Sequence, residues 1–256
     1  MSSPNLATRK LNALHGWKWL ADGFAMFRRS PVIWIALLFI YLLIGMVLST
    51  IKLIGPIVLN LLAPVFVAGF MIGCRALEKG EELEIAHLFA GFKHHTAQLI
   101  TVGGIYLAGA IVVVGIIFAG SDQAVLQAMV SGQKLTPEQA SAALDDGFLL
   151  TMLVGLGLML PLVMAYWFAP VLVAFHEMSG LQAMKQSFLA CLRNLLPFFI
   201  YSVIATILLV LAALPLFLGM LVMIPTMIAS LYASYRDIFV VPVSEAEAAV
   251  LDADEA

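Results

Sequence analysis

Charged residues are scarce in this chain of 256 residues: only 11% are Asp, Glu, Lys or Arg, whereas 62% are hydrophobic. Soluble domains have about 45–50% apolar and about 25% charged residues. A soluble core of this size could not hide so much apolar surface, because much of a small domain lies at the water boundary. The composition therefore excludes a soluble enzyme, a nucleic-acid-binding protein and a disordered protein. It predicts a multi-pass membrane protein.

Motifs of catalytic and metal-binding sites are also missing. The sequence has no GxSxG elbow, P-loop, GxGxxG, HExxH or CxxC motif. We therefore expect no catalytic residue, no metal ligand and no cofactor. Only two cysteines occur, Cys74 and Cys191, and both are expected near cytoplasmic helix ends, where reducing conditions disfavour a disulfide.

Long runs without Asp, Glu, Lys, Arg or His dominate the chain. A helix needs about 20 apolar residues to cross the hydrocarbon core of a bilayer. Five runs are long enough, and the last is long enough for two helices, with a break at Leu214-Pro215. We predict an all-α, polytopic membrane protein whose six transmembrane helices cover residues 31–51, 53–74, 96–121, 147–175, 195–213 and 216–235.

The basic residues are distributed asymmetrically about these spans. All Lys and Arg residues except Lys52 and Lys134 lie on one side, the side that also carries both termini. Because cytoplasmic loops are enriched in Lys and Arg, we expect a bacterial inner-membrane protein with both termini in the cytoplasm. We also expect a short helix at 137–144, and a disordered acidic tail at 244–256.

Two sequence elements recur three times. The pattern Pro-x-x-(Val/Ile)-Ala occurs in every second span, and a Phe-containing segment that ends in a basic or imidazole side chain precedes every other span. These segments are amphipathic, as is typical of helices in the headgroup plane, and cover about residues 11–29, 84–94 and 181–193. We predict one domain, residues 1–243, of three repeats. Each repeat is an interfacial helix plus a transmembrane hairpin, and a pseudo-threefold axis along the membrane normal relates the three.

Three motifs suggest a family. Gly-Trp-x-Trp-Leu at 16–20 leads into Phe-Arg-Arg-Ser-Pro at 27–31, and Tyr-x-x-Tyr-Arg-Asp at 232–237 closes the sixth span. With these motifs the chain resembles uncharacterised bacterial six-helix integral inner-membrane proteins. That family is distantly similar to the membrane domain of some glycerophosphodiester phosphodiesterases. The resemblance covers nearly the whole chain and implies the fold, but it implies no activity and no functional residues.

Basic side chains at the ends of the interfacial segments are candidates for binding lipid headgroups, since Lys and Arg stay in water while neighbouring apolar side chains enter the membrane. These candidates are Arg28, Arg29, Lys93, His94 and Arg193.

Proline and small residues inside the spans are interpreted as packing features. Pro64, Pro170 and Pro225 are predicted to kink or notch their helices, although the carbonyl groups they leave free could also coordinate a solute. The small residues Gly69 and Gly73 are predicted to let helices approach closely within the bundle, with oligomerisation as the alternative.

Imidazole and carboxylate groups gather on the predicted cytoplasmic side. An interfacial role is favoured over a metal site for the four histidines His87, His94, His95 and His176. A solvated loop is expected for the acidic run Glu78, Glu81, Glu82 and Glu84.

The favoured function is non-enzymatic: organising or binding lipid or partner proteins at the cytoplasmic face. The alternative is a transporter or channel for a small uncharged or amphipathic solute, near the three prolines. An intramembrane enzyme acting on lipid rests only on His176, Glu177 and the distant resemblance. Expected partners are membrane lipid and a membrane protein or second copy of the chain, but not nucleic acid.

Overall fold

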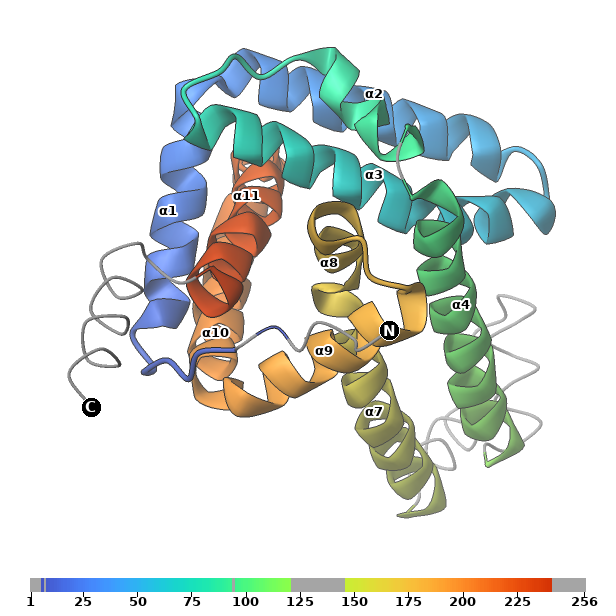
Figure 1. Ribbon diagram of the computed structural model, residues 1–256. Coiled ribbons are helices and arrows are strands. Elements are labelled where there is room, and N and C mark those ends of the chain that lie inside the picture. Colours follow the sequence, from blue (N-terminus) through green and yellow to red (C-terminus); the bar gives the residue numbers. More distant parts are fainter. Residues whose placement is uncertain (1–5, 7, 94, 121–145, 241–256) are drawn as a thin grey trace.

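The computed structural model describes residues 6, 8–93, 95–120 and 146–240, and these ranges contain helices and no strand (Figure 1). His94, the expected helix at 137–144 and the acidic tail lie outside the described residues. The elements are α1 (His15–Arg29), α2 (Pro31–Ser49), α3 (Ile54–Glu78), η1 (Ile85–Phe92), α4 (Thr96–Ala119), α7 (Asp146–Trp167), α8 (Ala169–His176), α9 (Gly180–Arg193), α10 (Leu195–Ala213) and α11 (Met220–Phe239).

Five of the described segments are long and apolar enough to cross a membrane, rather than the six predicted. They are Pro31–Ser49, Ile54–Glu78, Thr96–Ala119, Leu150–His176 and Leu195–Ala213. The helix α11 is long enough but less apolar, because it carries five hydroxyl residues and has Arg236 and Asp237 in its last turn. The all-helical membrane fold is thus confirmed, with five candidate spans in the described ranges.

The fourth predicted span, 147–175, corresponds to the candidate span Leu150–His176, but Phe168 divides it into α7 and α8. Pro170 in the first turn of α8 lacks a backbone N–H and restricts the residue before it. At the break the Ser187 hydroxyl of α9 accepts a hydrogen bond from the Phe168 N–H at 2.9 Å. The same hydroxyl donates to the Met164 carbonyl at 2.6 Å. A side chain inserted between these backbone groups satisfies both and explains the kink.

The second interfacial segment is a short 3₁₀ helix, η1, and its start is closed by a reciprocal cap. The Glu84 carboxylate accepts a bond from the backbone of His87, and the His87 Nδ1 accepts the Glu84 N–H at 3.0 Å. Glu84 therefore caps this helix, an arrangement that satisfies two otherwise unpaired N–H groups.

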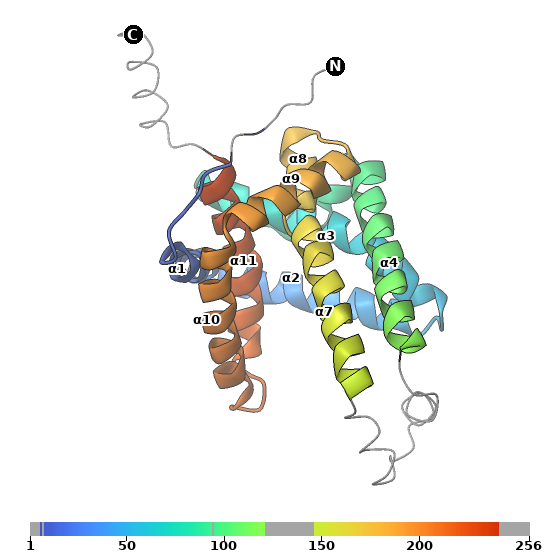
Figure 2. The same ribbon diagram turned by 90° about the horizontal axis from the view of Figure 1, so that it is seen from below.

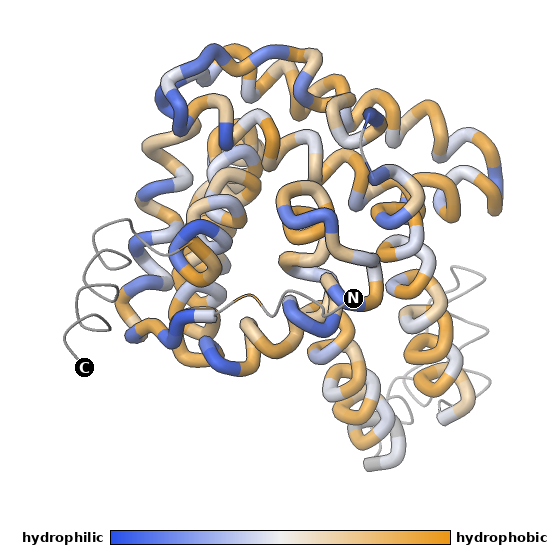
Figure 3. The backbone as a smooth tube through the Cα atoms, in the orientation of Figure 1, coloured by the Kyte–Doolittle hydropathy of each residue, from blue (hydrophilic) through white to orange (hydrophobic). Residues whose placement is uncertain are grey.

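The three elements that precede the hairpins are built into the bundle. α1 packs on α11 and α10, η1 packs on α3, and α9 packs on α7 and α8. Figure 2 shows α4, α7, α10 and α11 running in a similar direction, whereas α2 and α3 cross behind them. Hydrophobic residues dominate the long helices, and hydrophilic residues gather in the loops and at helix ends (Figure 3).

Close backbone approach fixes α1 against its neighbours. A Cβ atom at Gly23 would lie 2.5 Å from the Thr226 carbonyl oxygen, and one at Gly16 would also collide with the backbone of α10. Because only glycine leaves this room, the crossing of α1 over α10 and α11 depends on two glycines spaced by two turns of helix.

Candidate functional site

The carboxyl-terminal ends of α3, α8 and α11 meet beside α1, and their polar residues form the candidate site. Each of these helices continues beyond its Pro-x-x-(Val/Ile)-Ala pattern and carries one or two polar residues in its last turn. These residues are Glu78 of α3, His176 of α8, and Arg236 and Asp237 of α11.

Glu78 links α3 to α11. Its carboxylate accepts a short hydrogen bond from the Tyr232 hydroxyl. It also forms an ion pair with Arg236, whose Nη1 atom lies 2.6 Å from the Glu78 Oε1 atom. The Arg236 Nη2 atom also lies 3.6 Å from the carboxylate of Asp22 on α1. These four residues, named the Glu78 cluster below, join three helices. The expectation that Glu78 lies in a solvated loop was wrong, because it occupies the last turn of α3.

Arg236 stays charged in this cluster. Its partial burial lowers the pKa of the guanidinium, but the hydrogen bond and charge of Glu78 and the charge of Asp22 outweigh that effect and raise the pKa overall. One guanidinium thus pairs with two carboxylates, so the cluster keeps a net negative charge when all three groups are ionised.

The end of α8 is held by aromatic contacts. The Arg75 guanidinium lies 5.0 Å from the centre of the Phe175 ring, a cation–π distance. Phe175 also packs against Tyr235, and the Tyr235 hydroxyl lies 2.8 Å from the His176 Nε2 atom. Glu177, which follows with a left-handed backbone, lies instead 3.8 Å from His95 and is mostly exposed.

His176 and Glu177 therefore contact different partners, and the described residues include no group of three His, Cys, Asp or Glu residues placed to hold a metal ion. The arrangement suits fixing helices to one another and presenting an exposed surface.

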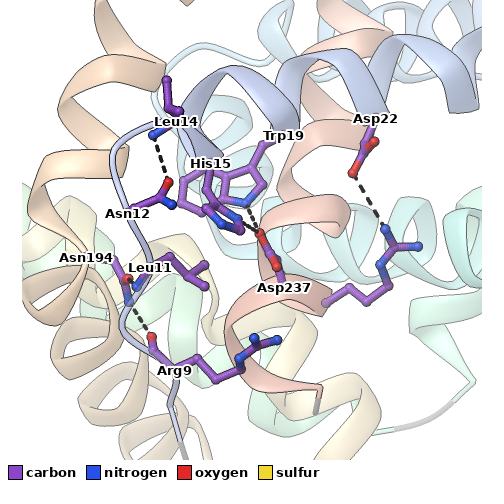
Figure 4. A network of polar contacts seen from close by, with 10 residues as sticks. Arg9, Leu11, Asn12, Leu14, His15, Trp19, Asp22, Asn194 and Asp237 are labelled. Atoms are coloured by element: carbon purple, nitrogen blue, oxygen red, sulfur yellow. Dashed lines mark hydrogen bonds and ion pairs between the residues drawn. The ribbon is translucent and has the colours of Figure 1, made fainter. Parts of the chain in front are cut away.

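Asp237 fixes the start of α1 to the end of α11 (Figure 4). Its Oδ2 atom accepts a hydrogen bond from the Trp19 indole at 2.8 Å and lies 2.6 Å from the His15 Nδ1 atom. Trp19 is fully buried, so its N–H needs this partner. We call His15, Trp19 and Asp237 the Asp237 cluster.

The segment before α1 is fastened by the buried Asn194 at the junction of α9 and α10 (Figure 4). The Asn194 Oδ1 atom accepts the Leu11 N–H at 2.9 Å, and its Nδ2 donates to the Arg9 carbonyl at 2.9 Å. The Arg9 N–H in turn donates to the Ile238 carbonyl at 3.0 Å. These bonds connect the beginning of the chain to its last hairpin, and we call them the Asn194 clamp.

The predicted headgroup-binding residues are spread over three separate elements. Arg28 and Lys93 are exposed, and the Arg28 guanidinium lies 6.0 Å from the Phe24 ring. Arg29 is also exposed but donates to the Leu77 carbonyl at 2.8 Å, and Arg193 donates to the Thr8 hydroxyl at 2.6 Å. Among the candidates that the structure describes, Arg28 and Arg29 lie together as neighbours on α1.

The predicted packing residues lie inside the protein. Pro64 and Pro225 are within α3 and α11, Pro170 is in the first turn of α8, and all three are buried. Gly69 lies against the backbone of η1, and Gly73 lies against the side chain of Leu83 just before it.

The two flanks of α1 face opposite ends of α11. Asp22, His15 and Trp19 meet Arg236 and Asp237 near its end. The opposite flank, with Trp17 and Phe24, lies beside residues near its start. That flank is apolar yet open: Trp17 is 54% exposed and Phe24 is 43% exposed.

Three apolar cavities open between the helices. One of about 490 Å³ separates the apolar flank of α1 from α10 and α11. A central cavity of about 320 Å³ lies among α2, α3, α7, α10 and α11. A third, of about 280 Å³, lies between α7 and α10, and Trp167 and Tyr201 line both this cavity and the central one.

Sequence reasoning missed the Glu78 cluster, the Asp237 cluster and the Asn194 clamp. The available signal was the Tyr-x-x-Tyr-Arg-Asp motif, which supplies Tyr232, Arg236 and Asp237, together with charged residues directly after apolar spans.

Apolar helices long enough to cross a bilayer, joined by polar contacts at one end, define a multi-pass helical membrane protein. The chain is 32% identical over 253 residues to a probable inner membrane protein of Burkholderia thailandensis, with 90% of this chain and 93% of the relative covered. The chain therefore belongs to the family of that probable inner membrane protein. No family model matches the chain, and no solved structure matches it. The predicted relation to glycerophosphodiester phosphodiesterases gains no support and stays a prediction.

Proposed function

We propose that the protein is a non-enzymatic protein of the bacterial inner membrane that binds anionic lipid headgroups at its cytoplasmic face. By holding lipid there, it would organise the surrounding membrane or a partner protein, either another membrane protein or a second copy of the chain. Both termini are proposed to be cytoplasmic.

The observation that carries this proposal is the pair of flanks on α1. In water, a flank with open Trp17 and Phe24 side chains is unfavourable, whereas at a membrane interface aromatic rings and Lys or Arg side chains are both favoured. Arg28 beside Phe24 and exposed Lys18 fit that environment. α1 would then lie in the headgroup plane, with its apolar flank toward the acyl chains.

We also propose that α11 is a sixth span and that three repeats build the domain. The equivalent contacts of two repeats support this. Gly23 meets Ser230 where α1 crosses α11, and Leu88 meets Gly69 where η1 lies on α3. Gly23 and Leu88 occupy equivalent positions in two copies of the interfacial segment. Ser230 and Gly69 are also equivalent, since each directly follows a copy of the Pro-x-x-(Val/Ile)-Ala pattern. The third repeat departs, because Ser187 inserts at Phe168 instead.

The basic residues support the orientation. Three arginines, Arg29, Arg75 and Arg236, lie at the end of the molecule where α3, α8 and α11 finish. Lys52 lies in the loop between α2 and α3, at the opposite end of α3. A Lys and Arg excess of this kind is typical of cytoplasmic loops.

The test is binding to vesicles of phosphatidylglycerol and phosphatidylcholine in equal amounts. In the Arg28→Gln, Lys93→Gln double variant, neither exchanged side chain has a hydrogen bond or ion pair with another described residue, so the protein should fold normally. Its preference for phosphatidylglycerol should fall by about thirtyfold, since each of the two removed charges near an anionic surface contributes about 1 kcal/mol.

Lys52→Gln is the matched control, because it removes an exposed charge at the opposite end of the α2–α3 hairpin. The proposal fails if the double variant keeps the lipid preference of the unchanged protein, or if Lys52→Gln lowers it equally.

A second candidate, transport of a small uncharged or amphipathic solute, is favoured by the central cavity. Phe66 and Val67 follow Pro64, Ile224 and Met227 flank Pro225, and all four line that cavity. Uptake into proteoliposomes, compared with a Pro64→Ala, Pro170→Ala double variant, tests this function. Uptake no faster than in protein-free vesicles would count against it.

A further inference from the structure

The cavity between α1, α10 and α11 has the volume and apolar lining of a site for a hydrocarbon chain. Trp17, Leu20 and Phe24 form one wall, and Leu208, Val222 and Met223 form the other. It lies on the flank of α1 that faces away from Arg236 and Asp237 and toward the apolar length of the hairpin. Its volume of about 490 Å³ exceeds that of either other described cavity.

The charges beside this cavity are not balanced. Arg28 lies against the ring of Phe24, which lines the cavity. The acidic residue of α1, Asp22, is on the opposite flank and already faces Arg236 at 3.6 Å. A ligand that enters between α1 and the hairpin therefore meets the positive charge of Arg28, for which the described residues supply no paired carboxylate, and an anionic group fits it.

We infer that this cavity holds an acyl chain of an anionic phospholipid, whose headgroup lies at Arg28 on α1. The inference rests on the proposed function and adds to it a defined site with one bound lipid. The chain replaces water or empty space against apolar walls, and Trp17 at the rim marks the level where the hydrocarbon begins.

The first test fills the cavity. Val222→Phe places a ring where the acyl chain would lie, whereas Val203→Phe places the same ring on α10 outside the cavity. Both valines are about equally exposed, at 37% and 42%, so the two variants should fold alike. Native mass spectrometry after reconstitution with dioleoyl phosphatidylglycerol and dioleoyl phosphatidylcholine counts the retained lipid. We expect one retained phosphatidylglycerol in the unchanged protein and in Val203→Phe, and about tenfold less in Val222→Phe.

The second test needs no change in the cavity. Phosphatidylglycerol with a brominated acyl chain should quench the fluorescence of the unchanged protein more strongly than brominated phosphatidylcholine at the same fraction. In Trp17→Phe most of that difference should vanish, because Trp17 is the indole on the cavity wall, whereas Trp19 is fully buried.

The outcomes separate this inference from the function it rests on. Retention that is equal in Val222→Phe and Val203→Phe, with quenching equal for the two lipids, overturns the acyl-chain site. If the Arg28→Gln, Lys93→Gln variant still loses its vesicle preference, headgroup binding stands without this site. If the Arg28→Gln, Lys93→Gln variant keeps phosphatidylglycerol binding at full strength, the proposed function fails together with the anionic lipid inferred here.

Discussion

The helices α11 and α8 end beside one another, but they are held there by different interactions. At the end of α11, Arg236 and Asp237 form ion pairs and charged hydrogen bonds with α1 and α3. At the end of α8, His176 makes one hydrogen bond and Phe175 makes ring contacts. The charged end thus ties together three helices, whereas the aromatic end fills space between two of them.

This difference teaches where the bundle depends on single residues. A hydrogen bond to a buried, charged partner is expensive to break, because the remaining group stays unpaired. A ring contact can be replaced by another apolar side chain at smaller cost. We therefore expect substitutions at the end of α11 to matter more than those at the end of α8.

The largest effect is expected for Asp237→Ala. It leaves the fully buried Trp19 N–H without its acceptor and removes the partner of His15, so unfolding should become easier by about 3 kcal/mol. Thermal unfolding in detergent, followed by circular dichroism, measures the loss. Asp22→Ala removes one partly exposed contact at 3.6 Å and should cost below about 1 kcal/mol. Equal losses of stability would mean that the Asp237 cluster contributes no more to folding than the contact between Asp22 and Arg236.

Glu78→Gln should have an intermediate effect. The amide can still accept a hydrogen bond but has no charge for Arg236, which keeps Asp22 as its partner. Glu78 and Arg236 are 35% and 39% exposed, so the ion pair is partly screened and its loss should cost about 1 kcal/mol. Repeating the unfolding at 1 M salt should reduce the difference from the unchanged protein, and a difference independent of salt would contradict the ion-pair interpretation.

His176→Phe tests the aromatic end. It keeps a ring beside Tyr235 and removes one hydrogen bond at 2.8 Å, so a cost of about 0.5–1 kcal/mol is expected. Tyr235→Phe should give a similar value, and the double variant should cost no more than either single one. Losses that add in the double variant would show that the two residues act independently.

The smallest effect concerns Cys191, whose sulfur lies 3.6 Å from the Met164 carbonyl beside the break between α7 and α8. Burial raises the pKa of its thiol to about 12, although the hydrogen bond with Ser187 acts in the opposite direction. A neutral, buried thiol reacts slowly. In a Cys74→Ala background, maleimide labelling of Cys191 at pH 7 should therefore be negligible until a denaturing detergent unfolds the protein. Rapid labelling of the folded protein would mean that the break opens.

The sequence predicts helices well where one property decides them. Residues 195–213 were predicted as a span and match α10, because Arg193 and Leu214-Pro215 bound an uninterrupted apolar run. The break at Phe168 was missed, because it depends on a hydroxyl supplied by Ser187 from another helix. Hydropathy within one segment contains no information about such a partner.

The candidate site was predicted less well, for the same reason. Glu78 was assigned to a solvated loop, although its partner Tyr232 lies 154 positions further along the chain. Basic residues near helix ends were recognisable from composition, so Arg28 and Lys93 were found and are exposed. Their role in binding headgroups stays a prediction, since contacts within the chain do not test the binding of lipid.

The Asn194 clamp has a consequence for the order of assembly. Arg9 and Leu11 bond to a residue about 180 positions later, and α1 rests on α10 and α11, which are synthesised last. The first amphipathic helix must therefore wait at the membrane surface while two hairpins insert, and it docks only when the third arrives. A chain stopped after α8 should leave α1 open to proteases, and the complete chain should protect it. The amino-terminal segment is therefore synthesised first but docks into its final position last.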